Sequence, residues 1–141
     1  MSNRTNLVHA AFSALSHAPP AKIPQRGIVY TSDGRTAICA LTSKMYSGQG
    51  GLERAWSAIR TGTRAKLDGA IQNGGTAYLA FSSPLGMFLL PWDMLSRLTG
   101  DNTSSKRDPI VLEVDHNDSW AFVGPRGHRT NIDQYRLAQA A

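Results

Sequence analysis

The stretch GIVYTSDGRTAICALTSK, residues 27–44, decides the fold because it contains two strand-like runs around one tight turn. The runs at 27–32 and 35–44 are rich in β-branched and aromatic residues, which favour β-strands. The Asp33-Gly34 pair between them is typical of a short hairpin turn. The sequence therefore predicts a β-hairpin here, with its second strand longer than its first.

Cys39 is the one cysteine of the chain and lies inside the second run, so it has no partner for an internal disulfide. Side chains alternate along a strand, so Ala37, Cys39 and Leu41 share one face, opposite Ile38 and Ala40. A thiol among apolar neighbours has a raised pKa and is unreactive. We expect Cys39 to be a buried structural residue and not a nucleophile.

The rest of the chain predicts two further hairpins and several helices, all within a single domain of residues 1–141. The hairpins combine 76–83 with 87–91 and 109–116 with 119–124. The helices are expected at 5–17, 52–59 and 64–71, from Pro91 onward, and after a capping Asn131, with a linker at 18–26 and a mobile loop at about 100–108. The fold class is therefore α+β: a mixed, largely antiparallel sheet of about six strands in three hairpins, flanked by three to four helices.

The segment 52–59 is expected to be helical because its apolar residues recur at the spacing of one helix face. These residues are Leu52, Ala55, Trp56 and Ile59. The same spacing predicts that Trp56 packs in the core and that Arg54 lies on an outer, basic face.

Charge is distributed unevenly along the chain. The formal net charge is +5, but residues 1–66 carry nine basic side chains against two acidic ones, whereas residues 67–141 carry six against eight. A basic half is typical of proteins with a polyanionic partner. We expect DNA or RNA as that partner, with phosphates contacted by Lys44, Arg54, Arg60, Arg64 and Lys66.

Several classes of protein are disfavoured by the composition. No apolar run reaches 18 residues and the first twenty residues are too polar for a secretory signal, so we expect a cytoplasmic protein without a membrane partner. The four histidines stand far apart, without the spacing of a zinc site, so no metal or other cofactor is expected.

The glycine-rich segment SGQGG, residues 47–51, lacks the spacing of a P-loop or a dinucleotide-binding fingerprint. Backbone N–H groups beside glycines at the start of a helix can still bind a single phosphate. A phosphate contact and a plain flexible connection both remain open for this segment.

The order of the predicted elements resembles small relatives of the PD-(D/E)XK restriction-endonuclease-like superfamily. The resemblance lies in the pattern of ICALTSK, a helix, TAYLAFSS, MFLLPWDML and IVLEVDH before a helix with Asp133-Gln134-Tyr135. It implies that Lys44 is the lysine of the acid-x-lysine triplet, with Thr42 in place of the acid and Asp33 as the candidate metal-binding aspartate. A domain that retains nucleic-acid binding and has lost two-metal hydrolysis is implied, because a lone lysine cannot hold the cation.

Three hypotheses of function follow. The first is a non-catalytic nucleic-acid-binding domain. The second is a Mg²⁺-dependent nuclease with Asp33, Lys44, Glu113 and Asp115 in its site, although Asp115 also suits a hairpin turn. The third is a protein-interaction or inhibitor module of phage or mobile-element origin, with an exposed Trp92, Trp120 or Phe122 as the anchor for its partner.

Overall fold

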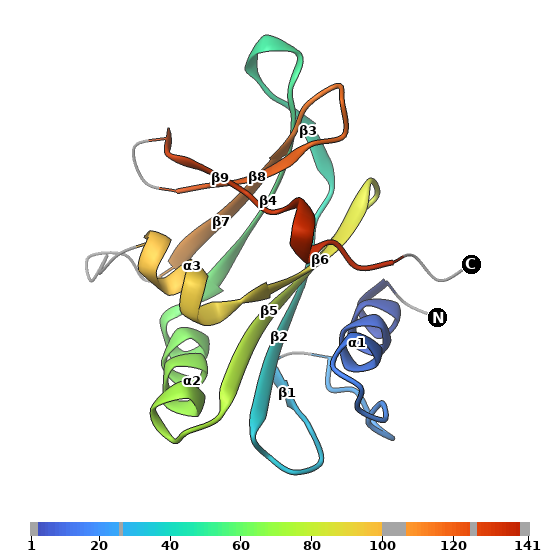
Figure 1. Cartoon of the computed structure of the whole chain (residues 1–141), viewed down its shortest axis with the longest axis vertical. Coiled ribbons are helices and arrows are strands. Elements are labelled where there is room, and N and C mark those ends of the chain that lie inside the picture. The colour runs from blue at the N-terminus through green and yellow to red at the C-terminus, as the bar shows by residue number, and fades with distance from the viewer. Residues whose placement is uncertain (1–2, 26, 100–106, 125–126, 139–141) are drawn as a thin grey trace.

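The computed structural model describes residues 3–25, 27–99, 107–124 and 127–138, and these form an α+β fold with three α-helices and nine strands in two sheets (Figure 1). The helices are α1 (Asn3–Ala14), α2 (Thr61–Gln72) and α3 (Trp92–Thr99), and η1 (Gln49–Gly51) and η3 (Asp133–Tyr135) are 3-10 helices. The strands are β1 (Ile28–Tyr30), β2 (Thr36–Thr42), β3 (Met45–Ser47), β4 (Glu53–Arg60), β5 (Thr76–Ser83), β6 (Gly86–Pro91), β7 (Arg107–Val114), β8 (Trp120–Val123) and β9 (Arg129–Asn131).

Sheet A contains four strands in the order β1-β2-β5-β6. The predicted hairpins β1–β2 and β5–β6 are both confirmed, and β2 pairs with β5 in parallel. The alternation of side chains along β2 is confirmed as well. Ala37 and Cys39 are buried on the face toward sheet B, and Ile38 and Ala40 are buried on the opposite face against α1.

Sheet B contains five antiparallel strands in the order β3-β4-β7-β8-β9. The predicted β7–β8 hairpin is confirmed, but the helix expected at 52–59 is wrong because this segment forms the strand β4. Apolar residues at 55 and 59 fit the period of a strand as well as that of a helix, and pairing with β3 on one side and β7 on the other satisfies the backbone of β4.

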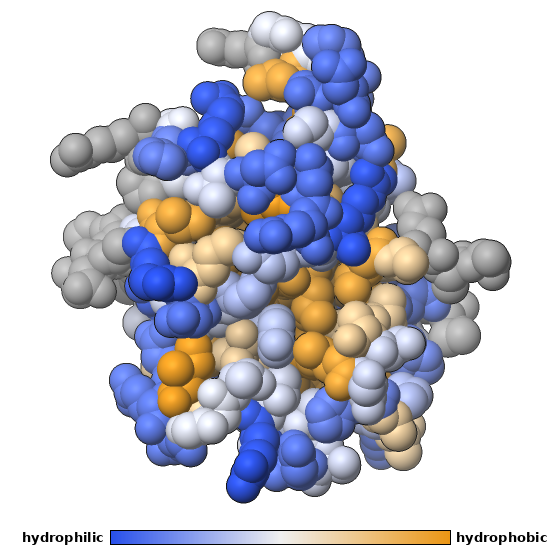
Figure 2. Space-filling view, viewed as in Figure 1, coloured by the Kyte–Doolittle hydropathy of each residue, from blue (hydrophilic) through white to orange (hydrophobic). Residues whose placement is uncertain are grey.

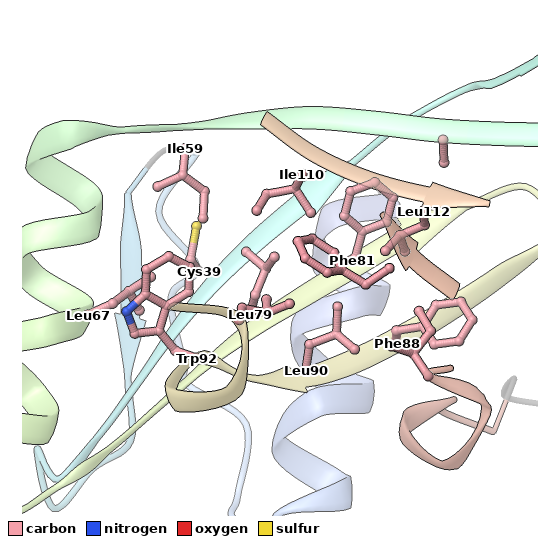
Figure 3. Close-up of a cluster of buried hydrophobic side chains, with 14 of the residues drawn as sticks. Cys39, Ile59, Leu67, Leu79, Phe81, Phe88, Leu90, Trp92, Ile110 and Leu112 are labelled. Atoms are coloured by element: carbon pink, nitrogen blue, oxygen red, sulfur yellow. The ribbon is translucent and has the colours of Figure 1, made fainter. Parts of the chain in front are cut away.

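The main core lies between the two sheets. Figure 3 shows Cys39 of β2 and Ile59 of β4 pointing toward each other, with Leu79, Phe81 and Leu90 lining the same layer. Leu67 of α2 and Trp92 of α3 close one end of this core, and α1 covers the other face of sheet A with four buried residues: Leu7, Val8, Ala11 and Phe12. The two sheets therefore share one apolar layer.

The N-terminal helix is attached to the predicted linker by one side chain. The guanidinium of Arg4 donates hydrogen bonds to the carbonyl oxygens of Pro24, Gly27 and Ala40, at 3.0, 3.1 and 2.6 Å. The charge of Arg4 is thus used to hold α1 and the linker against β2.

Near the C-terminus the predicted helix after Asn131 is replaced by the single turn η3. The side chain of Asn131 does accept a hydrogen bond from the backbone N–H of Asp133, at 3.1 Å, as a helix cap would. Most of the loop expected at 100–108 lies outside the described residues, and β7 already begins at Arg107.

The described helices all fall short of the length and apolar character that a membrane span needs. Figure 2 shows the same side of the molecule as Figure 1, and apolar surface on it is broken into small patches among polar side chains.

Candidate nucleic-acid interface

The outer face of sheet B, on the side away from the core, carries two exposed aromatic side chains. Tyr46 lies opposite Arg54 in the β3–β4 pairing, and Trp56 lies two residues further along β4, so both rings project from the same face. Tyr46 is 47% exposed and Trp56 is 50% exposed. The prediction that Trp56 packs in the core is therefore wrong, because in a strand Trp56 alternates with the buried Ala55.

Both aromatic residues line a hollow of about 670 Å³, and we call it the aromatic hollow. Two cations border it, Lys44 from the β2–β3 connection and Arg60 from the end of β4. Its other lining residues are Asn3, Thr42, Ser43, Ser57 and Ala58. Of the five predicted phosphate-binding residues, Lys44 and Arg60 line this hollow.

Ser43 fixes the local geometry of the aromatic hollow. Its Oγ accepts a hydrogen bond from the backbone N–H of Trp56 at 3.0 Å and donates one to the carbonyl oxygen of Lys44 at 2.8 Å. One hydroxyl therefore joins the segment that carries Lys44 to the strand that carries Trp56. This pair of hydrogen bonds holds the Lys44 segment beside the strand that carries the indole.

Arg54 lies on the same outer face and is engaged by a buried carboxylate. Glu113, directly opposite on β7, is only 3% exposed and accepts hydrogen bonds from Arg54 and from Arg129 of β9. Burial alone would raise the pKa of Glu113, but the hydrogen bonds and charges of the two guanidinium groups outweigh it and hold the pKa below its usual value. Two arginines share one carboxylate, so this part of the face keeps a net positive charge.

Arg64 and Lys66 lie elsewhere, on α2. The guanidinium of Arg64 stacks 5.8 Å from the centroid of the Trp92 ring and approaches Asp68 at 4.0 Å. Lys66 borders a separate hollow of about 610 Å³ together with Tyr30 and Arg35. The structure thus divides the predicted basic set between the outer face of sheet B and α2.

The four residues of the nuclease hypothesis are found in different surroundings. Asp33 lies in the β1–β2 turn, where it accepts hydrogen bonds from the Thr31 hydroxyl at 2.5 Å and from the Arg35 backbone at 3.0 Å. Glu113 is held by its two arginines, while Lys44 borders the aromatic hollow.

Asp115 begins the β7–β8 turn, and its Oδ1 accepts from the backbone N–H groups of Asn117 and Ser119 at 2.9 and 3.0 Å. This is the turn geometry that the sequence also allowed for Asp115. Across the ranges that the structure describes, no group of three or more histidine, cysteine or acidic side chains is arranged to hold a metal ion.

The three anchors of the protein-interaction hypothesis are buried, so this part of the hypothesis is wrong. Trp92 and Trp120 are 0% exposed and Phe122 is 1% exposed, and all three belong to the core between the sheets. Trp120 and Phe122 lie at the two inward positions of the strand β8, and Trp92 is the first residue of α3, with its side chain in the core.

The glycine segment 47–51 forms the β3–β4 connection and does not precede a helix as predicted. The Gly48 N–H donates to the Leu52 carbonyl oxygen at 2.7 Å, and Gly50 and Gly51 adopt positive φ angles of 70° and 78°. Glycine is favoured at such angles because it has no Cβ. The segment is therefore explained as a turn.

Compared with protein-family models, with curated proteins and with solved structures, the chain matches none of them.

Proposed function

We propose that the protein binds DNA or RNA through the outer face of sheet B and that it has no catalytic step of its own. The observation that carries this proposal is the convergence of Lys44 and Arg60 on a hollow that also contains Tyr46 and Trp56. Cations that border a surface hollow suit phosphate groups, and phosphate contacts position a protein on nucleic acid without reading its sequence.

Electrostatics of the surrounding face support the same proposal. Arg54 and Arg129 have one carboxylate, that of Glu113, between them, so their pairing leaves a net positive charge close to the hollow. The isoelectric point of about 9.8 favours association with polyanions at neutral pH. A cytoplasmic location, which the sequence predicts, fits a nucleic-acid partner.

The non-catalytic part of this proposal follows from the positions of the candidate carboxylates. Asp33 and Asp115 each accept hydrogen bonds within their own turns, and Glu113 is neutralised by arginines. Metal-assisted hydrolysis of a phosphodiester needs carboxylates that converge on a cation. Of the properties of the PD-(D/E)XK superfamily, we therefore propose nucleic-acid binding for this protein and not hydrolysis.

The test is a salt titration of binding to fluorescently labelled DNA and RNA, measured by anisotropy. We expect the Lys44→Ala/Arg60→Ala double variant to bind more weakly and to reduce the slope of log affinity against log salt by about 1 for each phosphate that is no longer neutralised. The matched control is Lys22→Ala/Arg97→Ala, which removes the same charge from the linker and from α3, where both residues are exposed.

The control variant is expected to bind nearly as well as the unaltered protein. Equal weakening in both double variants would mean that net charge, and not this face, governs binding. Failure of the unaltered protein to bind any nucleic acid at low salt would remove the proposal entirely.

A further inference from the structure

We infer that the nucleic acid bound on this face is single-stranded, with its bases stacked on Trp56 and Tyr46 and its phosphates beside Lys44 and Arg60. The inference rests on the proposed function and adds to it the class of ligand. Most of the described aromatic side chains are buried, and three are about half exposed: Tyr30, Tyr46 and Trp56. Two of these three, Tyr46 and Trp56, line the aromatic hollow together with Lys44 and Arg60.

The two aromatic residues lie at diagonal positions on one face of the sheet, which places two rings near each other for contact with bases. In an antiparallel pair, side chains on one face at diagonal positions lie roughly 7–8 Å apart, and Tyr46 and Trp56 occupy such positions on β3 and β4. Aromatic side chains on a sheet face bind unstacked bases in this way, and every base offers a π-face, so the contact tolerates any sequence.

A duplex cannot use these rings. In double-stranded DNA the bases are stacked on each other and paired, and exposing one to a protein ring costs a few kcal/mol of unstacking and unpairing. A duplex on this face would contact Lys44 and Arg60 and leave the indole of Trp56 without a base. The aromatic part of the site therefore favours a strand whose bases are already free.

The aromatic hollow also continues along a path that suits an extended strand. Asn3, Thr42, Ser43 and Lys44 line it and also line a second hollow, of about 940 Å³, beside α1. Asn6, His9 and Ser13 of α1 border that second hollow with polar groups. Lys44 stands where the two hollows meet, so a strand whose bases stack on Trp56 can run past Lys44 along α1.

Tryptophan fluorescence gives a direct test because Trp56 is exposed while Trp92 and Trp120 are completely buried. We expect single-stranded oligonucleotides to quench the Trp56 emission and duplexes of the same sequence to quench it little. In Trp56→Phe the quenching should vanish while affinity for single strands, measured by anisotropy, stays within a few-fold. Affinity should rise with oligonucleotide length up to a site size of about 4–16 nucleotides.

Alanine variants separate stacking from charge. Trp56→Ala and Tyr46→Ala are each expected to weaken single-strand binding roughly tenfold, the usual scale for removing one base–aromatic stack, and to leave duplex binding almost unchanged. Tyr30→Ala is the matched control. Tyr30 is exposed to a similar degree, 46%, but lines the separate hollow of about 610 Å³ with Arg35 and Lys66. Circular dichroism checks that each variant remains folded.

The outcomes distinguish this inference from the proposed function. Equal affinity for single strands and duplexes, with both insensitive to Trp56→Ala but weakened by Lys44→Ala/Arg60→Ala, would overturn base stacking and leave phosphate binding intact. No binding of either form would overturn both. Capture of a protein partner through Trp56, with no nucleic acid bound, would also overturn both and assign the face to protein recognition.

Discussion

Glu113 and Arg129 lie sixteen residues apart in the chain, yet Nε and one terminal nitrogen of Arg129 both lie 2.9 Å from the same carboxylate oxygen of Glu113. Arg54 of β4 contacts the other oxygen, so Glu113 links β4, β7 and β9 across the outer face of sheet B. Such charge-assisted hydrogen bonds are stronger than neutral ones.

Glu113→Gln should lower the free energy of unfolding by about 1.5–3 kcal/mol at pH 7, the usual scale for hydrogen bonds to charged groups. The two guanidinium groups are about half exposed and can regain water, which keeps the effect below that of a fully buried pair. Urea denaturation measures it. Glu53→Gln, an exposed carboxylate on β4, is the control and should change stability by less than about 0.5 kcal/mol; equal effects would contradict the prediction.

Acid should destabilise the protein through the same carboxylate. The pKa of Glu113 is lowered in the folded state, so the unfolded chain binds protons more readily and stability falls as pH drops below the unfolded pKa of about 4.3. We expect urea titrations between about pH 5 and pH 3 to show a smaller fall for Glu113→Gln than for the unaltered protein. An identical fall would show that other carboxylates, such as Asp118 and Asp133, dominate.

Asp68→Ala should destabilise the contact between α2 and α3. The indole Nε1 of the buried Trp92 donates to Asp68 Oδ1 at 2.7 Å, and without that acceptor the buried N–H costs about 1–3 kcal/mol. Asp68→Asn keeps an acceptor and should recover part of this stability in thermal unfolding.

Arg64→Ala removes the guanidinium next to the same indole of Trp92 and should affect stability more than nucleic-acid affinity. Arg60→Ala should do the opposite. The reverse result would place Arg64 in the binding site.

Gly75→Ala should be destabilising although Gly75 has an ordinary backbone conformation. A Cβ at this position would lie 2.1 Å from the carbonyl oxygen of Arg35 and 3.0 Å from that of Ala70, so the backbone must shift, at a cost of about 1–3 kcal/mol. Gly69→Ala, inside α2 with no heavy atom within 4 Å of the new Cβ, should instead stabilise by roughly 1 kcal/mol. Chemical denaturation of both variants decides; effects of the same sign would refute the steric argument.

Cys39 should resist modification while the protein is folded. The thiol is buried between the sheets, and this burial raises its pKa to about 11. Because the thiolate is the reactive form, a disulfide reagent at about pH 8 should modify Cys39 only at the rate of unfolding, and at once in denaturant. Rapid modification of the native protein would show that the core opens easily.

The sequence is most informative where pattern and burial agree. The alternation around Cys39 predicts the strand β2, the residues that share each face and the burial of Cys39. The structure confirms these and buries the second face as well, against α1. The sequence is least informative for β4, where the interval between Ala55 and Ile59 matches a helix as well as a strand, and Trp56 falls on the same face as these two only in the helix. Pairing with β3 and β7 decides between them, and the β7 partner lies far away in the chain.

The aromatic hollow escapes prediction for the same reason. Because residues 53–60 form a strand, the side chain of Trp56 points outward and lines the same hollow as Lys44. The predicted helix places Trp56 in the core, away from Lys44. The exposed Tyr46 is the available signal, because an aromatic followed by Ser47 and Gly48 has few apolar neighbours along the chain to cover it.

The parallel pairing of β2 with β5 links the assembly of the two sheets. The segment between β2 and β5 contains β3, β4 and α2, and β3 and β4 belong to sheet B. The chain therefore forms two strands of sheet B before β5 can pair with β2 in sheet A. Closing such a long excursion is entropically costly and slows folding. We therefore expect sheet A to be completed late, after the β3–β4 hairpin has formed, and the surface that carries Trp56 to be among the earlier parts of the molecule to take shape.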